Sequence, residues 1–466
     1  MAAHDLTQRS WMALISIVKN EALKFFQRYG ISRAVLFNVL TQGWSALAVP
    51  VTMLIIASRL TAVEQGYYYT YSSVLALQVF VELGLVTVIV QVASHEWAFL
   101  QYDNYGKVFG NERALSRLSS LFHFALKWYS ASGLIVMLGL GFGGYYFLGA
   151  KPHPEINWQL PWFALSGVAG LALMMSPVFS VIEGCNQVRS IYRFRFLQGI
   201  LSSSAVIISI MLGFGLYALA IAASIRLLCG GLFIFIEHRA FIHQLLSNRI
   251  SEQIHWLAEV WPFQWRLGIS SLSGYFVFWL FTPVMFYYQS PQVAGQMGMT
   301  LTMLAVIEAT SFAWINTRMP QFGVLIAQKR YDELNQLFRQ LLRITLSVAG
   351  TLSLLLFILI YLLKSSRLEI RHRILPLLPT GFFIAQRLAN VAISAMAFYL
   401  RAHKREPMMM ISVTSAILTG ACTVLLGRYY GAVGAAIGYA AVTVLWVLPA
   451  TRHVFHVCSE KWHSGA

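Results

Sequence analysis

Long apolar stretches recur along the whole chain, and each is about as long as a membrane is thick. A helix needs roughly 20 apolar residues to cross the hydrocarbon core of a bilayer. Measured against that length, the sequence predicts twelve spanning helices near residues 35–58, 68–93, 121–147, 160–182, 196–214, 217–236, 264–288, 297–317, 343–363, 374–400, 407–426 and 431–451. Only 11% of the residues are charged, against roughly a quarter in soluble domains. The chain is therefore predicted to be an all-α polytopic membrane protein.

The predicted spans divide into six and six around a long polar segment. We predict an amphipathic N-terminal segment, an N-terminal six-helix lobe, a linker, a C-terminal six-helix lobe and a tail at residues 1–34, 35–236, 237–263, 264–451 and 452–466. The first of these segments mixes apolar and charged residues. Such a mixture is typical of a helix lying in the membrane interface and not of a cleavable signal peptide.

Lysine and arginine in the predicted loops fall mostly on one side of the membrane, the side that also holds both chain ends. Because basic loops stay in the cytoplasm, both termini are predicted to be cytoplasmic. One loop is an exception, since it carries four basic residues on the opposite side: Lys364, Arg367, Arg371 and Arg373. The other connections on that side are short, which leaves no room for an external catalytic domain.

The formal net charge of +16 raises the question of nucleic acid as a partner. A nucleic-acid-binding domain gathers its cations on one water-facing surface. Here the cations lie in short clusters between apolar stretches, so no nucleic-acid partner is predicted. The cysteines lack the spacing of a metal site or a disulfide framework: Cys185, Cys229, Cys422 and Cys458.

Catalysis is not predicted. The chain has only three aspartates, Asp5, Asp103 and Asp332, and no two of them are close in sequence. A metal-dependent glycosyltransferase needs neighbouring carboxylates to hold its cation. The sequence also lacks the Gly-Lys-Ser/Thr loop that cradles nucleotide phosphates. We therefore expect no catalytic residues and no metal ligands.

An internal echo relates the two halves of the chain. A proline, a glycine and a glutamate follow one another in the first two predicted spans of each half: Pro50, Gly66 and Glu82, then Pro283, Gly295 and Glu308. This order supports two six-helix lobes related by an internal repeat. Transporters built from repeats place their substrate site between the repeats, near the bilayer midplane.

Two stretches resemble a known family. "ASRLTAVEQGYYYTYSSVLALQVFVELGL", at 57–85, resembles the first loop and second helix of polysaccharide flippases of the multidrug/oligosaccharidyl-lipid/polysaccharide exporter superfamily. "NTRMPQFGVLIAQKRYDELNQLFRQLLR", at 316–343, is similar to the cytoplasmic amphipathic segment of those proteins. The resemblance implies a central cavity between two lobes and a flippase for an undecaprenyl-diphosphate-linked oligosaccharide in the bacterial inner membrane. It also implies a role in surface polysaccharide or lipopolysaccharide biosynthesis.

Cations within apolar stretches are the first candidates for substrate contacts. Arg226 and Arg387 lie deep in predicted spans, whereas Lys127 and Arg266 lie near span ends. A buried cation is costly in hydrocarbon, so it faces a cavity or a partner. The deep arginines would either grip a diphosphate, which the planar guanidinium suits, or form structural ion pairs. The two others would line the cavity or extend to the headgroups.

Glu82 and Glu308 occupy matched places in the two predicted repeats. Each carboxylate would either pair with an arginine or bind and release a coupling ion, since burial favours the neutral form. No cofactor is expected, and coupling to H⁺ or Na⁺ stays open.

Aromatic and amide side chains are candidate sugar contacts, because rings stack on sugar faces and amides bond hydroxyls. These residues are Gln42, Trp44, Gln264, Tyr275, Trp279, Trp314 and Asn316. The alternative for each aromatic residue is a place in the belt that marks membrane–water interfaces.

The expected partners are a polyprenyl-diphosphate-linked glycan, membrane lipids, and a polysaccharide polymerase with its chain-length machinery. The alternatives are a multidrug or organic-cation exporter of the same superfamily, a membrane glycan polymerase or ligase, an unrelated two-bundle transporter, and an accessory scaffold. Deep arginines favour an anionic substrate over an organic cation.

Overall fold

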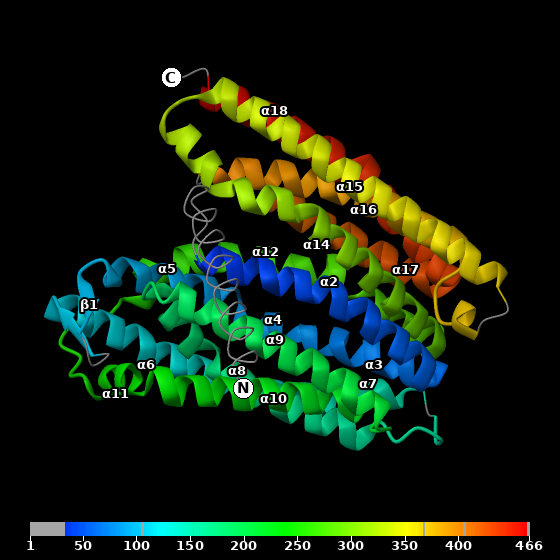
Figure 1. The fold of residues 1–466 in the computed structure, drawn as a ribbon, viewed down its shortest axis with the longest axis horizontal. Coiled ribbons are helices and arrows are strands. Elements are labelled where there is room, and N and C mark those ends of the chain that lie inside the picture. Colours follow the sequence, from blue (N-terminus) through cyan, green and yellow to red (C-terminus); the bar gives the residue numbers. More distant parts are fainter. Residues whose placement is uncertain (1–32, 104–106, 152, 367–368, 404–406, 464–466) are drawn as a thin grey trace, which may run out of the picture.

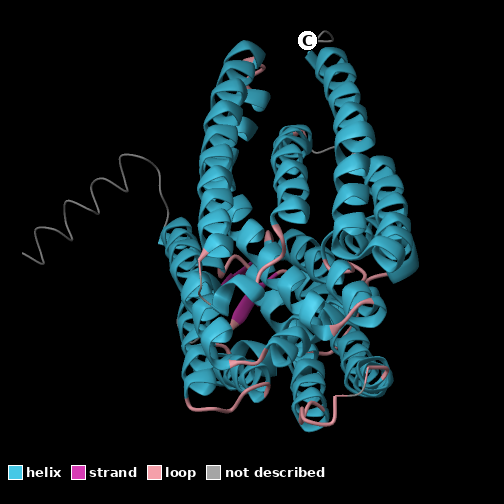
Figure 2. Ribbon diagram, turned by 90° about the vertical axis from the view of Figure 1, so that its right-hand side faces the viewer, coloured by secondary structure: helices cyan, strands magenta, loops and turns pink. Residues whose placement is uncertain are grey.

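The computed structural model describes residues 33–103, 107–151, 153–366, 369–403 and 407–463. The predicted N-terminal interfacial helix lies outside these residues. Helices make up almost all of the described chain, and one short antiparallel β-hairpin pairs Leu100 with Gly110 and Tyr102 with Val108 (Figure 2). The all-α class predicted from the sequence is confirmed.

The first half of the described chain contains one run of helices and the hairpin (Figure 1). Its elements are α2 (Arg33–Arg59), α3 (Ala62–Leu75), α4 (Val79–Glu82), α5 (Leu85–Trp97), β1 (Leu100–Tyr102), β2 (Val108–Gly110), α6 (Glu112–Leu134), α7 (Gly141–Gly149), α8 (Gln159–Gly184), α9 (Val188–Met211), α10 (Tyr217–Glu237) and α11 (Arg239–Ser247).

The second half is helical throughout its described residues. Its elements are η3 (Trp256–Val260), α12 (Trp261–Phe278), α13 (Phe281–Tyr288), α14 (Pro291–Ala327), α15 (Tyr331–Ser365), η4 (Glu369–His372), α16 (Leu377–Ala402), α17 (Met409–Ala441), η5 (Val442–Val447) and α18 (Leu448–His463).

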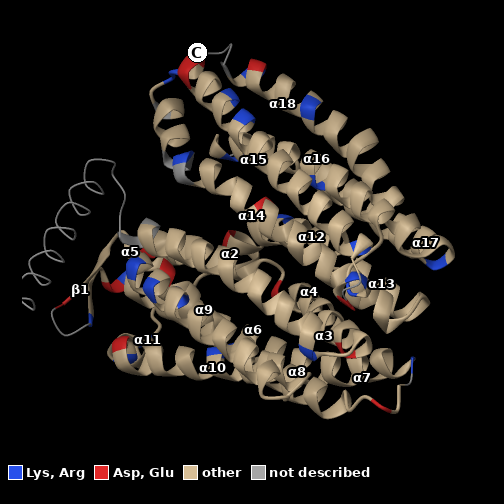
Figure 3. Cartoon of the chain, turned by 45° about the vertical axis from the view of Figure 1, so that its right-hand side comes forward, with Lys and Arg blue, Asp and Glu red and all other residues tan. Residues whose placement is uncertain are grey.

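By length and hydropathy, nine helices within the described residues could cross a membrane, or eleven if each of two bent helix pairs is one span. The chain is therefore a multi-pass membrane protein. Figure 3 shows most charged residues near the ends of the helices, with few along their middle. That distribution keeps the hydrocarbon layer free of most charge.

The predicted span 68–93 is not one straight helix. Leu83 and Gly84 both have positive φ angles, 48° and 69°, and the helices on either side of them are bent by 46°. Left-handed backbone cannot continue a right-handed helix. The capping box between Thr61 and Glu64 begins α3, so the polar turn before this span is also its start signal.

The longest apolar helix, at 409–462, folds back on itself. Gly431 has φ 61° and ψ −146°, a backbone conformation that essentially only glycine adopts. Across this turn Trp446 donates its indole N–H to Thr414 Oγ1 at 3.2 Å, and a Cβ on Gly438 would lie 2.8 Å from Cys422 Cβ. Contacts in this order define an antiparallel hairpin. The stretch thus supplies both predicted spans, 407–426 and 431–451.

The helices form two lobes that meet at one end. One buried apolar cluster contains residues from both halves of the chain, such as Tyr67, Trp158, Phe286 and Met297. The two other clusters are separate, one in the first half and the start of α12 and one in the second half. In Figures 1 and 3 the lobes converge near α3 and α13 and diverge toward the C-terminus. We call the converging end the joined end.

Helix α12 contacts both lobes. A Cβ on Gly268 of α12 would lie 3.2 Å from the carbonyl oxygen of Leu83, at the break between α4 and α5. Farther along, Phe276 packs on Gly420 of α17, where an added Cβ would meet it at 3.3 Å. The same helix thus packs on the first half through its early turns and on the second half through its later ones.

Candidate functional site

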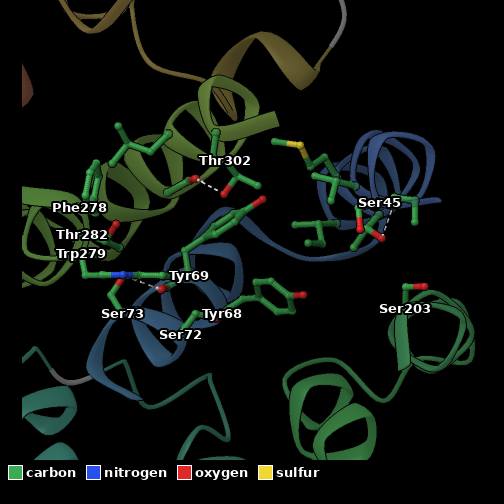
Figure 4. A pocket seen from close by; sticks show the side chains of 18 of the residues that line it. Ser45, Tyr68, Tyr69, Ser72, Ser73, Ser203, Phe278, Trp279, Thr282 and Thr302 are labelled. Atoms are coloured by element: carbon green, nitrogen blue, oxygen red, sulfur yellow. Dashed lines mark hydrogen bonds between the residues drawn. The ribbon is translucent and has the colours of Figure 1, made fainter. Parts of the chain in front are cut away.

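A cavity of about 600 Å³ lies between the two lobes. Six segments line it, contributed by α2, α3, α9, the α12–α13 bend, α14 and α16. Figure 4 shows Tyr68 and Tyr69 extending from α3 into this space, with Ser45 and Ser203 on one side and Thr302 on the other. The cavity is therefore built from both halves of the chain, as the internal echo predicts for a substrate site.

Glu308 and Arg387 are the only Asp, Glu, Lys or Arg residues among the described residues that line this cavity. Arg387 Nη1 donates to Glu308 Oε2, and Asn390 Nδ2 donates to Glu308 Oε1 at 2.8 Å. The side chains are 7% and 18% exposed for Arg387 and Glu308. A paired acid and base leave the lining with no net formal charge.

The guanidinium of Arg387 is not saturated by this pairing. Its Nε is shielded from solvent and has no hydrogen-bond partner among the described residues. Arginine offers five N–H donors in a fixed fork. An anion entering the cavity would find donors on Arg387 in addition to the one that Glu308 occupies.

Hydroxyl groups supply most of the other polar surface of the cavity. They belong to Ser45, Thr52, Tyr68, Tyr69, Ser72, Ser73, Ser203, Thr282 and Thr302. Several donate to carbonyls of their own helix, as Thr302 Oγ1 does to Gly298 at 2.7 Å. Each hydroxyl oxygen keeps acceptor capacity, so the wall can bond a ligand rich in hydroxyls.

Two tryptophans line the cavity at opposite sides. Trp44 donates its indole N–H to Ser203 Oγ at 2.8 Å, which ties α2 to α9. Trp279, at the bend after α12, is 46% exposed. Because a partly exposed indole presents a flat apolar face, Trp279 can stack on a ring of a ligand.

The joined end closes the cavity on one side through glycine contacts. A Cβ on Gly66 would lie 2.0 Å from the carbonyl oxygen of Pro291, and one on Gly298 would lie 2.4 Å from Tyr69 Cβ. Gln65, which is 1% exposed, donates to the carbonyl of Gly295 at 3.0 Å. We call these contacts between α3 and α14 the seal. On the predicted orientation, the seal faces the outside of the cell.

The structure brings four of the predicted site residues together at the cavity: Trp44, Trp279, Glu308 and Arg387. For Arg387 and Glu308, the ion pair and the cavity wall, which the sequence leaves as alternatives, occur together. Whether Arg387 binds substrate stays a prediction.

The other predicted cations lie outside the described lining. Arg226 is exposed on α10, where its carbonyl accepts from Gln198 Nε2 at 2.9 Å. Arg266 lies over the ring of Trp265, 5.5 Å from its centroid, and Lys127 is exposed on α6. Their roles in substrate binding stay predictions.

The remaining predicted residues are dispersed. Buried Gln264 accepts from Trp256 Nε1 at 2.9 Å, and Tyr275 packs edge-on against Phe80. Glu82 ends α4 at the helix break and lies outside the lining. Three residues are exposed elsewhere on α2 and α14: Gln42, Trp314 and Asn316.

The hydroxyl residues are the part of the site that sequence reasoning missed. A signal for them exists in the run "YYYTYSS" at 67–73, where hydroxyl groups gather within a predicted span. Hydroxyl groups that donate to carbonyls of their own helix are tolerated in membranes. A run of such residues within a span therefore does not by itself indicate a binding site.

Neither a search against protein-family models nor a search of curated proteins finds a match for this chain. Solved structures do match over nearly the whole chain. An inward-facing multidrug resistance MATE family transporter of the MOP superfamily has a TM-score of 0.62 at 11% identity, covering 93% of this chain and 99% of the other. The lipid II flippase MurJ, in an inward closed conformation, has a TM-score of 0.61 at 13% identity, covering 92% and 90%.

A third match is a MOP superfamily transporter from Pyrococcus furiosus, with a TM-score of 0.52 at 12% identity, covering 92% of this chain and 96% of the other. The fold and the cavity together define a two-lobed, multi-pass membrane protein with a chamber between its lobes that contains one buried ion pair. Its particular fold is that of the MOP superfamily transporters.

Proposed function

We propose that this protein is a flippase that moves an undecaprenyl-diphosphate-linked oligosaccharide across the bacterial inner membrane by alternating access. The product would serve surface polysaccharide biosynthesis. The observation that carries the proposal is the Arg387–Glu308 pair in the wall of a cavity whose other lining residues combine hydroxyls, aromatic rings and aliphatic side chains. The fold shared with a lipid II flippase supports a lipid-linked substrate.

Arg387 is the residue that would meet the diphosphate. Its guanidinium can make two parallel hydrogen bonds to phosphate oxygens and stays charged at cellular pH. The incoming phosphate would replace Glu308 as the acceptor, so Arg387 is never left unpaired. Breaking a buried pair without such a replacement costs about 3–5 kcal/mol.

Glu308 would change its own state in the same step. Once it loses Arg387, it keeps the amide of Asn390, at 2.8 Å, as a partner. A carboxylate in that setting gains from binding a proton or Na⁺. Substrate entry and ion binding would therefore be linked at one pair, with H⁺ or Na⁺ as the coupling ion.

The sugars would lie against the hydroxyls and Trp279, while the prenyl tail stays in lipid. The present conformation has the seal closed, and the lobes diverge at the other end. The chain matches the inward-facing transporter with a TM-score of 0.62 and an outward-facing one of the same superfamily with 0.53. The higher score with the inward-facing transporter supports a state open to the cytoplasm, and on the predicted orientation both termini lie on that side. Opening the seal would release the headgroup to a polymerase and its chain-length machinery outside.

A multidrug exporter is the second candidate. The lining has no net formal charge among its described residues, and it exposes Phe278 and Trp279. An organic cation could stack on these rings and pair with Glu308. In that case Glu308 and not Arg387 would contact the substrate.

The two candidates separate in one experiment. A strain whose own copy is deleted receives wild type, Arg387→Ala, Arg387→Lys or Glu308→Gln, and its surface polysaccharide and drug tolerance are measured. We expect Arg387→Ala to abolish the polysaccharide and Arg387→Lys to restore only part of it, because lysine lacks the fork. Arg428→Ala is the matched control, since Arg428 is an exposed arginine beside Tyr288 and Tyr429.

Normal polysaccharide in the Arg387→Ala strain, with the protein present in the membrane by immunoblot, contradicts the proposal. Loss of drug tolerance in Glu308→Gln with unchanged polysaccharide supports the exporter instead.

A further inference from the structure

The described parts of the basic loop that is the exception to the predicted charge asymmetry, residues 364–366 and 369–373, lie at the joined end. Within it, Lys364 Nζ donates to the carbonyls of Arg371 at 2.5 Å and of Ile374 at 2.8 Å. Gln296 of α14 donates to the carbonyl of His372 at 2.9 Å. The loop is thus folded against the end of α15 and held on α14, with part of its positive charge used to bond its own backbone.

The other lobe covers this loop at Arg373. Gln65 of α3 donates through the same Nε2 to the carbonyls of Gly295 and of Arg373, each at 3.0 Å. Arg373 therefore lies where α3 and α14 form the seal. A movement that separates α3 from α14 would break the bond to the Arg373 carbonyl and change the surroundings of this half-buried side chain.

The guanidinium of Arg373 is incompletely satisfied in this conformation. Its Nη1 is shielded from solvent and has no hydrogen-bond partner among the described residues. Burial lowers the pKa of Arg373, although Glu369 and Glu64 of the opposite lobe act in the other direction. A buried donor without an acceptor destabilises the state that contains it. The closed seal is therefore the less favourable state for this side chain.

We propose that Arg373 belongs to an anion-binding site at the outer mouth of the cavity, with its Nη1 donor shielded while the seal is closed and freed when the seal opens. The ligand class is a phosphate or diphosphate headgroup, whose oxygens supply the acceptors that Arg373 lacks. This inference rests on the proposed function. It adds a second arginine, after Arg387, to the route that the diphosphate headgroup would follow.

The position of Arg373 relative to Arg387 gives the site a direction. The two arginines are fourteen residues apart, one just before α16 and one within it. Arg387 lies ten residues after Leu377, where α16 begins, which is roughly 15 Å along the helix axis at about 1.5 Å per residue. A headgroup leaving Arg387 would thus meet a second guanidinium near the outer surface, at the moment when the opening seal frees its Nη1 donor.

The test uses the purified full-length protein and inorganic pyrophosphate, with inorganic sulfate as the competing anion. Two substitutions hold the seal open independently: Gly295→Trp, whose Cβ would lie 2.9 Å from Gly66 N, and Gly298→Leu, whose Cβ would lie 2.4 Å from Tyr69. We expect each to bind pyrophosphate at least about tenfold more tightly than wild type. Adding Arg373→Gln should remove that gain, whereas adding Arg428→Gln should leave it intact.

Equal pyrophosphate affinity with and without Arg373→Gln in both opened backgrounds overturns the site. So does tight binding by wild type that Arg373→Gln leaves unchanged. The purified protein needs no glycan for this measurement. If the strain with Arg387→Ala makes normal polysaccharide while Arg373 still binds pyrophosphate, the proposed function fails and the anion site stands.

Discussion

Gly66 and Gly295, the matched glycines of the two repeats, lie against each other where α3 crosses α14. A Cβ on Gly295 would lie 2.9 Å from the backbone nitrogen of Gly66. The two positions that the internal echo pairs in sequence are therefore one contact in space. This contact lets two helices from different lobes approach closely enough to close the joined end.

We expect Gly66→Ala to weaken the seal. The new Cβ would lie 2.0 Å from the carbonyl oxygen of Pro291, and overpacking of this kind costs about 1–3 kcal/mol. The melting temperature in detergent should fall, and surface polysaccharide should decrease. Gly274→Ala on α12 is the control, because nothing lies within 4 Å of its Cβ. Equal melting temperatures for the two variants would contradict the role of the glycine contact.

Reversing the pair, with Glu308→Arg and Arg387→Glu together, separates stability from transport. Each single change places two like charges side by side, so each alone should lower the melting temperature and abolish flipping. The double variant restores opposite charges and should recover most of the stability. Flipping should stay absent, since the guanidinium now projects from α14 and not from α16. Recovery of polysaccharide in the double variant would show that the pair is only structural.

Arg117 should hold the start of the second half onto the first. Its Nε donates to Glu96 at 2.8 Å and its Nη2 to Glu259 at 2.5 Å, and its side chain is 21% exposed. Arg117→Ala removes both pairs, so the melting temperature should fall by several degrees. Protease should cut the 237–263 linker faster.

Arg113 provides the matched comparison for that prediction. It pairs with Glu252, also in the linker, but its side chain is 69% exposed. Exposed pairs contribute about 0–1 kcal/mol, so Arg113→Ala should change the melting temperature little. If Arg113→Ala lowered the melting temperature as much as Arg117→Ala does, the bridge that Arg117 makes between Glu96 and Glu259 would not explain the loss of stability.

Gly431→Ala should destabilise the hairpin between the last two predicted spans. Its φ of 61° and ψ of −146° cost a residue with a Cβ about 1–3 kcal/mol. Gly350→Ala is the control, because Gly350 is in α15 and nothing lies within 4 Å of its Cβ. We expect a lower melting temperature for the first variant alone, measured in the same detergent.

Hydrophobicity along the chain predicted most of the spans. Lipid offers the backbone no hydrogen-bond partners, so each apolar stretch must satisfy its own backbone N–H and C=O groups by forming a helix. Hydrophobicity did not predict the break at Leu83, although Glu82 and Gly84 flank this residue within the apolar stretch. Backbone direction there depends on the contact with Gly268 of α12, a residue far away in the sequence.

The candidate site shows the same division. Arg226 and Arg387 both lie deep in apolar sequence, and the amides of Gln386 and Asn390 beside Arg387 do not by themselves say which arginine faces the cavity. Only Arg387 lines the cavity, since the face a helix turns inward is set by the helices packed around it. The hydroxyls of Tyr68, Tyr69, Ser72 and Ser73 gain their place in the wall in the same way.

The sequence by itself determined that the chain crosses the membrane many times, and it placed Gly66 and Gly295 at matching points of two predicted repeats. Apolar length is enough to predict the spans, because it reflects transfer into lipid and not contacts with other helices. The order of residues in the two predicted repeats is read directly from the sequence. Only the tertiary structure decided that Glu308 bonds Arg387 in the cavity wall and that Arg373 lies beneath the other lobe. Those relationships depend on how each helix is rotated about its axis and on where it crosses its neighbours. Packing between residues far apart in the sequence sets both.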